Sequence, residues 1–384
     1  MSASEFRLPR GAILFMRDGF QYEFREDLGE VHHGLSLLLA RRRTSEGSIR
    51  GKVLLKAASV SQLLEPPRVK RARAKLEEQV RLATYLDHPV ILRVHGLHKA
   101  EGCWYVITEH PSGHSINTLL TLSGECGGRF SPFCALHVGA RVAEALEHAQ
   151  EAKDEQGRPL NIVHRALDVE HLFVDWNGDV QVSDFGLAMS DLPGRVSSTV
   201  HRPHGDAFYS SPEMLLTGRA DARSDLFALG NVLLELATGK NLLDAPDTLT
   251  EEVKGSLSVR QRRRVRHAIK RAQLAGSEPL VADAIWRAAT YTQADLEVLT
   301  EQLPQGLGLV LRKLLQPRPD DRYQSASELA ADLRRWLGEG DAYGREDASA
   351  ELHEMARRAH EVMVELGIRR PRGLQSSQDR ISTN

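Results

Sequence analysis

Residues 162–187 read IVHRALDVEHLFVDWNGDVQVSDFGL, and this stretch decides the fold. Its two apolar runs, LFV and VQV, stand on either side of Asn177-Gly178, a dipeptide that favours a tight turn between antiparallel strands. The sequence therefore predicts two short strands joined by this turn. Polar residues that can carry chemistry lie on both sides of the pair.

The chain before this stretch predicts a small sheet with one helix. FQYEFREDLGEV, LSLLLARRR and GKVLLKAAS are rich in β-forming residues, and the third of them carries Lys56. Residues 66–87 predict a helix, because proline stands near the start and apolar residues recur at helical spacing. VILRVHGLHKA and CWYVITEH complete the order β-β-β-α-β-β.

The chain after residue 113 is mostly helical in pattern. FCALHVGARVAEALEHAQEA predicts an amphipathic helix, and SDLFALGNVLLELATG predicts a buried one. A long loop is expected over 187–212, and further helices are expected as far as about residue 337.

Composition narrows the class of protein. The 384 residues are 41% hydrophobic and carry a formal net charge of −2, so no global charge field favours nucleic acid or membrane as the main partner. Cys103, Cys126 and Cys134 are too few for a disulfide framework and contain no C-x-x-C spacing. With no signal peptide and no apolar run long enough for a bilayer, a cytoplasmic protein is expected.

The quoted stretch resembles the catalytic core of bacterial-type, eukaryotic-like Ser/Thr protein kinases, which read H-R-D-L-x-x-x-N, a strand pair, then D-F-G. GDAFYSSPEML resembles the G-T-x-x-Y-x-x-P-E segment, and SDLFALG and PRPDDRYQSASELAADLRRWL resemble later helices of the family. LG-x-x-x-x-G, VLLK and LDHPVI precede the core in the family's order. The resemblance covers roughly residues 20–337.

The resemblance implies an α+β, two-lobed protein-kinase-like fold with a small β-rich N-lobe and a large helical C-lobe. The expected division is an N-terminal extension over 1–19, the N-lobe over 20–110 and the C-lobe over 111–337. A basic helical insertion is expected near 250–275. Residues 338–384 are expected to form a C-terminal helix and a disordered tail.

The nucleotide-binding positions of the family are only partly kept. Gly29 and Gly34 remain in the glycine-rich loop, but Val31 stands at the middle glycine and disfavours close backbone approach to phosphates. Leu54 replaces the small alanine that packs on adenine, although the lysine is kept as Lys56. The helix glutamate that pairs with this lysine is replaced by Gln79, and a one-residue shift would bring Glu78 there instead.

The catalytic positions are degenerate. Ala166 replaces the aspartate that accepts the hydroxyl proton, and alanine cannot accept a proton. Asp168 replaces a phosphate-contacting lysine, and His171 replaces the second metal-binding asparagine. Asp184 of D-F-G is the one metal ligand left, so ATP and Mg²⁺ are expected to bind weakly if at all.

The positions that hold the large lobe together are kept. His164 and Phe185 stand at stacked core positions, and Asp225 stands where relatives bind the backbone of the catalytic loop. Glu213 and Arg322 occupy positions that form a buried ion pair in the family.

The chain thus keeps the residues that stabilise the fold and has lost residues that the reaction needs. This combination predicts a pseudokinase, a non-catalytic signalling regulator or scaffold that binds another protein. The alternative is an active atypical Ser/Thr kinase that uses Lys56 and Asp184, with Asp168 as a substitute base. Transfer of phosphate that depends on Asp184 would distinguish the two.

Three features outside the kinase pattern remain open. Seven Lys or Arg residues lie between Arg260 and Arg271. They predict a solvated helical face, a docking site for an acidic protein, or a contact with nucleic acid or membrane. The third alternative is disfavoured, because aromatic residues on which bases could stack are missing nearby. Serine and threonine at 197–199 are candidate phosphorylation sites or simple loop residues. The helix expected after residue 345 packs on the large lobe or binds a partner.

Overall fold

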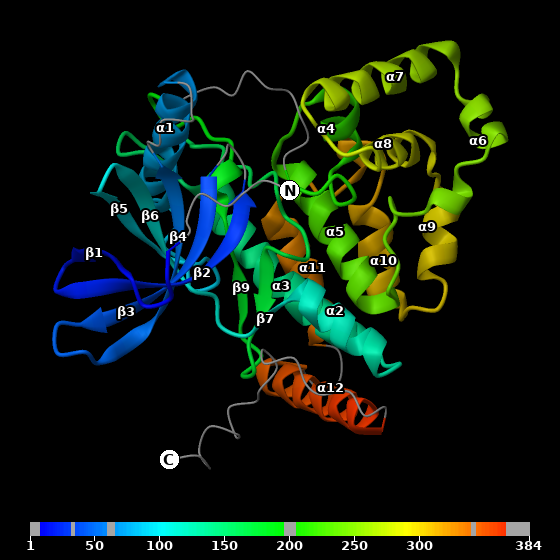
Figure 1. Cartoon of the computed structure of the whole chain (residues 1–384). Coiled ribbons are helices and arrows are strands. Elements are labelled where there is room, and N and C mark those ends of the chain that lie inside the picture. The colour runs from blue at the N-terminus through cyan, green and yellow to red at the C-terminus, as the bar shows by residue number, and fades with distance from the viewer. Residues whose placement is uncertain (1–7, 32–34, 60–65, 196–204, 339–342, 366–384) are drawn as a thin grey trace.

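The computed structural model describes residues 8–31, 35–59, 66–195, 205–338 and 343–365. Within these ranges a β-rich lobe and a larger helical lobe lie side by side (Figure 1). The predicted two-lobed fold is therefore confirmed. Gly34, with the two histidines before it, and the candidate phosphorylation sites at 197–199 lie outside the described residues.

The small lobe is a six-stranded antiparallel sheet with one helix. Its order is β1-β2-β3-β4-β6-β5. The elements are β1 (Ile13–Arg17), β2 (Phe20–Val31), β3 (Leu35–Thr44), β4 (Ile49–Ser59), α1 (Pro66–Ala83), β5 (Val94–Ala100) and β6 (Cys103–Glu109). Part of the expected N-terminal extension thus forms the edge strand β1, whose Phe15 is buried and stacks on Tyr22 of β2.

Alternation along β4 aims the lysine at the other lobe. Val53, Leu55 and Ala57 are buried in the core of the sheet. Because successive side chains of a strand point to opposite faces, Leu54 and Lys56 project together from the other face. Both are half-buried there, at the boundary between the lobes.

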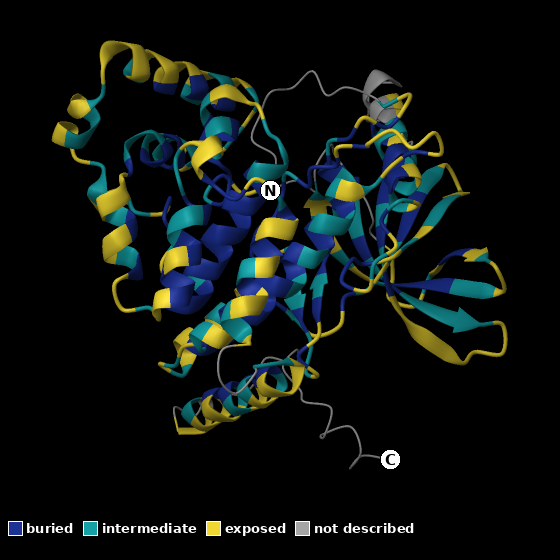
Figure 2. Ribbon diagram, turned by 180° about the vertical axis from the view of Figure 1, so that it is seen from behind, coloured by how far each residue is buried: buried dark blue, intermediate teal, exposed yellow. Residues whose placement is uncertain are grey.

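The large lobe is built around α5 (Ala222–Thr238), which is buried along almost its whole length (Figure 2). A small sheet of β7, β8 and β9 lies at the boundary with the other lobe. The remaining elements are β7 (His114–Ser115), α2 (Ile116–Glu125), α3 (Pro132–Glu151), β8 (Leu172–Val174), β9 (Val180–Val182), α4 (Pro212–Thr217), α6 (Glu251–Ser256), α7 (Val259–Leu274), α8 (Val281–Thr290), α9 (Gln293–Thr300), α10 (Gln305–Leu314) and α11 (Ala326–Leu337).

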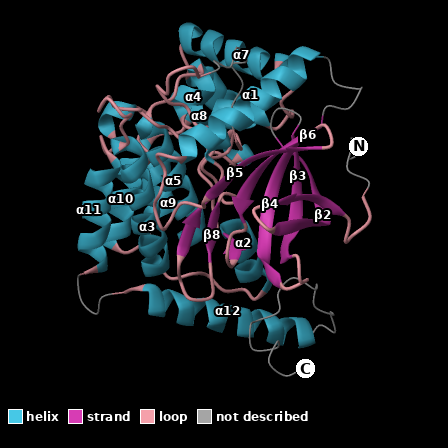
Figure 3. Cartoon of the chain, turned by 90° about the vertical axis from the view of Figure 1, so that its left-hand side faces the viewer, coloured by secondary structure: helices cyan, strands magenta, loops and turns pink. Residues whose placement is uncertain are grey.

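The last helix, α12 (Arg345–Glu365), packs on the large lobe below α2 and α3 (Figure 3). Leu352, Met355 and Ala359 on its apolar face are buried. Its first turn packs against Gly178 in the turn of the β8–β9 hairpin. Only glycine fits at this position, because its φ is +80° and a Cβ would stand 2.1 Å from the carbonyl oxygen of Arg345. The helix therefore braces the strands that lead to the candidate site. No helix among the described residues has the length and apolarity needed to cross a bilayer.

Candidate functional site

The two lobes meet where Lys56 of β4 forms an ion pair with Asp184, just after β9. The backbone of Asp184 has φ +60°, a conformation that non-glycine residues seldom adopt. Its Oδ1 accepts a hydrogen bond of 2.9 Å from the backbone N–H of Gly186, which holds the carboxylate in place. Strand pairing on each side thus brings together two groups 128 residues apart in sequence.

Asp168 accepts hydrogen bonds within its own turn. Its Oδ1 accepts hydrogen bonds from the backbone N–H groups of Glu170 (2.9 Å) and His171 (3.1 Å). The same oxygen lies 2.7 Å from Nδ1 of His171. A buried carboxylate needs such donors, so Asp168 is committed to holding the imidazole.

His171 links the two carboxylates. Its Nε2 lies 3.9 Å from Oδ2 of Asp184, while its Nδ1 bonds Asp168. Burial acts to lower the pKa of His171, but the hydrogen bond and charge of Asp168, together with the charge of Asp184, outweigh it and raise that pKa. These two carboxylates therefore stabilise the imidazolium form of His171 relative to that of a free histidine.

Lys56, Asp184, His171 and Asp168 form an alternating row of charges, which we name the cleft charge chain. Burial works against ionisation of both carboxylates, yet their cationic neighbours lower the pKa of each. The row thus alternates two basic side chains with two carboxylates.

The residues at the family's metal positions do not fit two Mg²⁺ ions. Mg²⁺ takes oxygen ligands in octahedral geometry, and imidazole is a poor substitute. Asp184 offers oxygen, but Lys56 already pairs with it and His171 lies on its other side. Among the described residues, no group of three or more acidic, histidine or cysteine side chains is placed to hold a metal.

The position of the missing base is closed. Ala166 is buried, and a Cβ on Gly205 would stand 2.8 Å from its Cα. The backbone of the loop after D-F-G therefore lies directly over Ala166. The cavity left beside it, between Arg165 and Asp206, is about 10 Å³, which admits about one water molecule.

Gln79 of α1 stands next to the lysine and offers it no charge. Both side chains lie against the backbone of Gly186. A Cβ added to that glycine would stand 2.7 Å from Nζ of Lys56 and 2.9 Å from Oε1 of Gln79. The neighbouring Glu78 does not replace it. Glu78 is buried and pairs with Lys75 (2.9 Å) and Arg195 (3.0 Å), so it does not take the place of Gln79 beside the lysine.

The Glu78–Arg195 pair is a contact that sequence reasoning missed. It ties α1 to the loop that follows D-F-G, and Arg81 of α1 reinforces it by donating to the carbonyl of Pro193 at 2.5 Å. A glutamate next to an expected pairing position was the only signal in the sequence. Its partner lies 117 residues away, so the pair could not be assigned without the fold.

In the glycine-rich region, the structure describes the residues up to Val31. Gly29 has φ +104° and pairs with Leu37 in the β2–β3 ladder. Val31 lines a cavity of about 10 Å³ with Lys56 and Gln79. Leu54 lies opposite Thr108 of β6 on the cleft face, where the family's adenine site would be.

Beneath the cleft charge chain, His164 and Asp225 fix the catalytic-loop backbone. Asp225 accepts the backbone N–H groups of His164 (2.6 Å) and Arg165 (2.8 Å). Nε2 of His164 lies 2.9 Å from the carbonyl of Ser183, and its ring meets Phe185 edge-on at 4.5 Å. Burial, followed by the charge of His171, lowers the pKa of His164 to about 4, so this ring is neutral.

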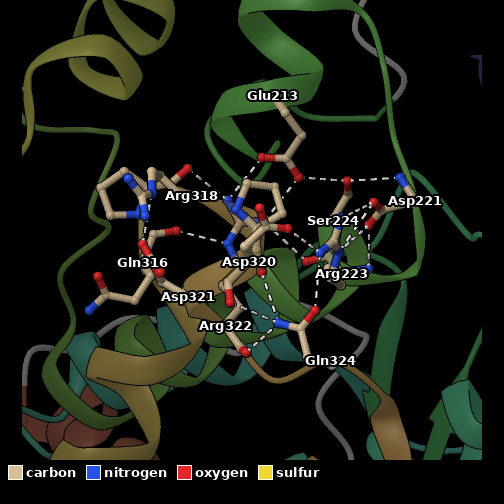
Figure 4. Close-up of polar contacts among 12 residues, drawn as sticks. Glu213, Asp221, Arg223, Ser224, Gln316, Arg318, Asp320, Asp321, Arg322 and Gln324 are labelled. Carbon is tan, nitrogen blue, oxygen red and sulfur yellow. Dashed lines mark hydrogen bonds and ion pairs between the residues drawn. The ribbon is translucent and has the colours of Figure 1, made fainter.

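Figure 4 shows Glu213 and Arg322 facing each other within a cluster of polar contacts. The guanidinium donates to both oxygens of Glu213, at 2.9 and 2.8 Å, and its side chain has no exposed surface. It also donates to the carbonyl of Gln316 (2.8 Å) and lies over the ring of Phe227. The pair joins α4 to the segment before α11.

A β-strand lysine paired with an aspartate after a hairpin, over a two-lobed scaffold with a buried glutamate–arginine bridge, defines a protein-kinase-like protein. The chain belongs to the protein kinase domain family, whose model matches residues 43–333. Its relatives place it with the bacterial-type, eukaryotic-like Ser/Thr kinases.

Three relatives illustrate the similarity. The tyrosine-protein kinase MasK of Myxococcus xanthus is 29% identical over 262 residues, 68% of this chain and 35% of MasK. The serine/threonine-protein kinase PrkC of Bacillus subtilis is 28% identical over 180 residues, 47% of this chain and 26% of PrkC. The probable serine/threonine-protein kinase PknB of Corynebacterium glutamicum is 28% identical over 233 residues, 60% of this chain and 30% of PknB. The matched region spans about a third or less of each relative.

Proposed function

We propose that this chain is a pseudokinase, a non-catalytic regulator or scaffold that acts by binding another protein. The observation that carries the proposal is Ala166, which leaves no proton acceptor at the base position and is covered by the backbone of Gly205. Loss of a general base costs about 10²- to 10⁴-fold in rate. The cytoplasm is the proposed setting, because Cys103, Cys126 and Cys134 are free thiols.

The cleft charge chain supports weak binding of nucleotide and metal. A metal–phosphate complex must compete with Lys56 and His171 for Asp184, and it meets the extra carboxylate of Asp168. Opposed charges at such distances interact strongly where water is scarce. Leu54 adds bulk where adenine would pack.

The rival function is an active atypical protein kinase. The three relatives described above, which are named as kinases, and the retained Lys56–Asp184 pair favour it. It would need Asp168 as the base. The hydrogen bonds that Asp168 accepts within its own turn, and its contact with His171, argue against that role.

Phosphate transfer from radiolabelled ATP tests the proposal. With Mg²⁺ or Mn²⁺ and a general protein substrate, we expect the wild-type chain to transfer no more label than the Asp184→Ala variant. The physical reason is the missing base, which removes proton transfer from the hydroxyl whatever metal is supplied. Wild-type transfer that disappears in Asp184→Ala would establish the rival function.

A further inference from the structure

The helix α7 lies at the outer edge of the large lobe (Figure 1), and basic residues line one side of it. The helix packs on α4 and α8 through Val265, Ala268 and Ala272. On the side next to α4 it borders a groove of about 340 Å³. The groove is lined by Leu216, Thr217, Arg260, Arg263, Arg264, His267 and Arg271. We call the five basic residues of this lining the α7 stripe.

The α7 stripe has no acidic partner in the part of the chain that the structure describes. Among the described residues, no carboxylate forms an ion pair with any side chain of the stripe, although most other arginines in the large lobe have such a partner. Arg271 is the half-buried end of the row and donates to the carbonyl of Leu215 at 2.8 Å. The other four side chains are exposed. The stripe therefore offers cationic donors to a ligand from outside.

The spacing of the stripe matches an extended chain. From Arg260 to Arg271 an α-helix rises about 16 Å, at about 1.5 Å per residue. About five residues of extended peptide cover that length at about 3.3 Å each. Four basic residues of the stripe, Arg260, Arg264, His267 and Arg271, recur about once per helical turn, near 5.4 Å. Alternate side chains of an extended peptide on one face stand near 6.6 Å apart. Carboxylates at alternate positions therefore fall close to successive basic groups.

We propose that the α7 groove docks an extended segment of another protein in which Asp or Glu occupies alternate positions. Arginine binds carboxylates through paired N–H donors. The terminal residues of this chain, 366–384, do not suit the groove, because they contain four arginines and one aspartate. The proposal goes beyond the proposed function, since the groove shares no residue with the cleft and holds for an active kinase equally.

Nucleic acid is the less suitable occupant. Proteins that bind single strands combine basic residues with aromatic side chains on which bases stack. The lining of this groove contains no aromatic ring other than the imidazole of His267.

Fluorescence anisotropy with the full chain tests the proposal. The probe is a fluorescein-labelled decapeptide in which glutamate alternates with serine. We expect saturable binding that weakens with added salt, because exposed charges are screened. The double variant Arg263→Glu with Arg264→Glu should weaken binding by at least tenfold. The matched control is Arg266→Glu with Lys270→Glu, which changes the same charge on exposed positions of α7 outside the groove lining; it should weaken binding by less than threefold.

Each other outcome overturns the proposal. If both double variants lose peptide binding equally, the binding depends on the net charge of α7 and not on the groove. Tighter binding of a phosphoserine peptide, or of a single-stranded oligonucleotide of the same charge, would assign the groove to phosphate. Self-association of the wild-type chain that is lost in Arg263→Glu with Arg264→Glu would make a second copy the occupant. Circular dichroism of both variants separates these results from misfolding, and the transfer assay reports on the cleft independently.

Discussion

Replacing Arg322 with alanine is expected to lower the free energy of unfolding by about 3 kcal/mol, the lower end of the range for breaking a buried ion pair. The Arg322 side chain is fully buried, whereas Glu213 is 18% exposed and keeps some access to water. The variant leaves Glu213 without its counter-charge and the carbonyl of Gln316 without its donor. Urea unfolding followed by circular dichroism measures the loss.

A surface arginine from the same segment provides the control. Arg318 is 78% exposed and pairs with Asp321, and exposed pairs of this kind contribute about 0–1 kcal/mol. Arg318→Ala should therefore leave the unfolding midpoint almost unchanged. If Arg322→Ala is no more destabilising than Arg318→Ala, the bridge does not hold the large lobe as we describe.

Replacing Asp225 with alanine is expected to lower the free energy of unfolding by about 2–6 kcal/mol. The variant leaves two backbone N–H groups without an acceptor, at a cost of about 1–3 kcal/mol each. Those groups belong to His164 and Arg165, and the backbone of Arg165 has φ +66°, which costs free energy to hold. Hydrogen exchange at these two amides should accelerate together with the drop in stability. Both effects share one cause, the loss of the carboxylate that accepts both bonds.

Asp221, four residues earlier, gives a graded comparison. It caps the start of α5 from a more exposed position, accepting the backbone N–H of Arg223 at 2.8 Å. Loss of such a cap costs about 1 kcal/mol. Asp221→Ala should therefore destabilise less than Asp225→Ala and leave exchange at His164 and Arg165 slow. Equal effects of the two variants would show that the hydrogen bonds from His164 and Arg165 to Asp225 do not hold this backbone segment in place.

The fold followed from sequence because several short motifs occur in a fixed order, each on an element that local pattern also indicates. The hairpin at Asn177-Gly178 and the apolar helix now seen as α5 were both expected. Strand β1 was not, because ILFMR carries no motif and its place depends on pairing with β2 and on the burial of Phe15. Pairing partners of edge strands are set by the assembled sheet and not by local sequence.

The site followed from sequence only in part. Lys56 and Asp184 were identified by their motifs, and the structure brings them together. The direction of Asp168 was not foreseen: sequence placed an acid near the phosphates, whereas the structure commits it to His171 in the same turn. Burial is the reason, since a desolvated carboxylate takes the nearest donors. The cleft charge chain therefore depends on side-chain directions that no motif specifies.

Titration of Mg²⁺·ATP into the wild-type chain by isothermal calorimetry tests the central claim most directly. The claim is that Lys56 and His171 compete with a metal ion for Asp184 while Asp168 adds an extra carboxylate, so that a metal-bound nucleotide binds weakly if at all. We predict no saturable heat up to about millimolar nucleotide, which corresponds to binding weaker than about −4 kcal/mol. A dissociation constant in the micromolar range that is lost in Asp184→Ala would contradict the account.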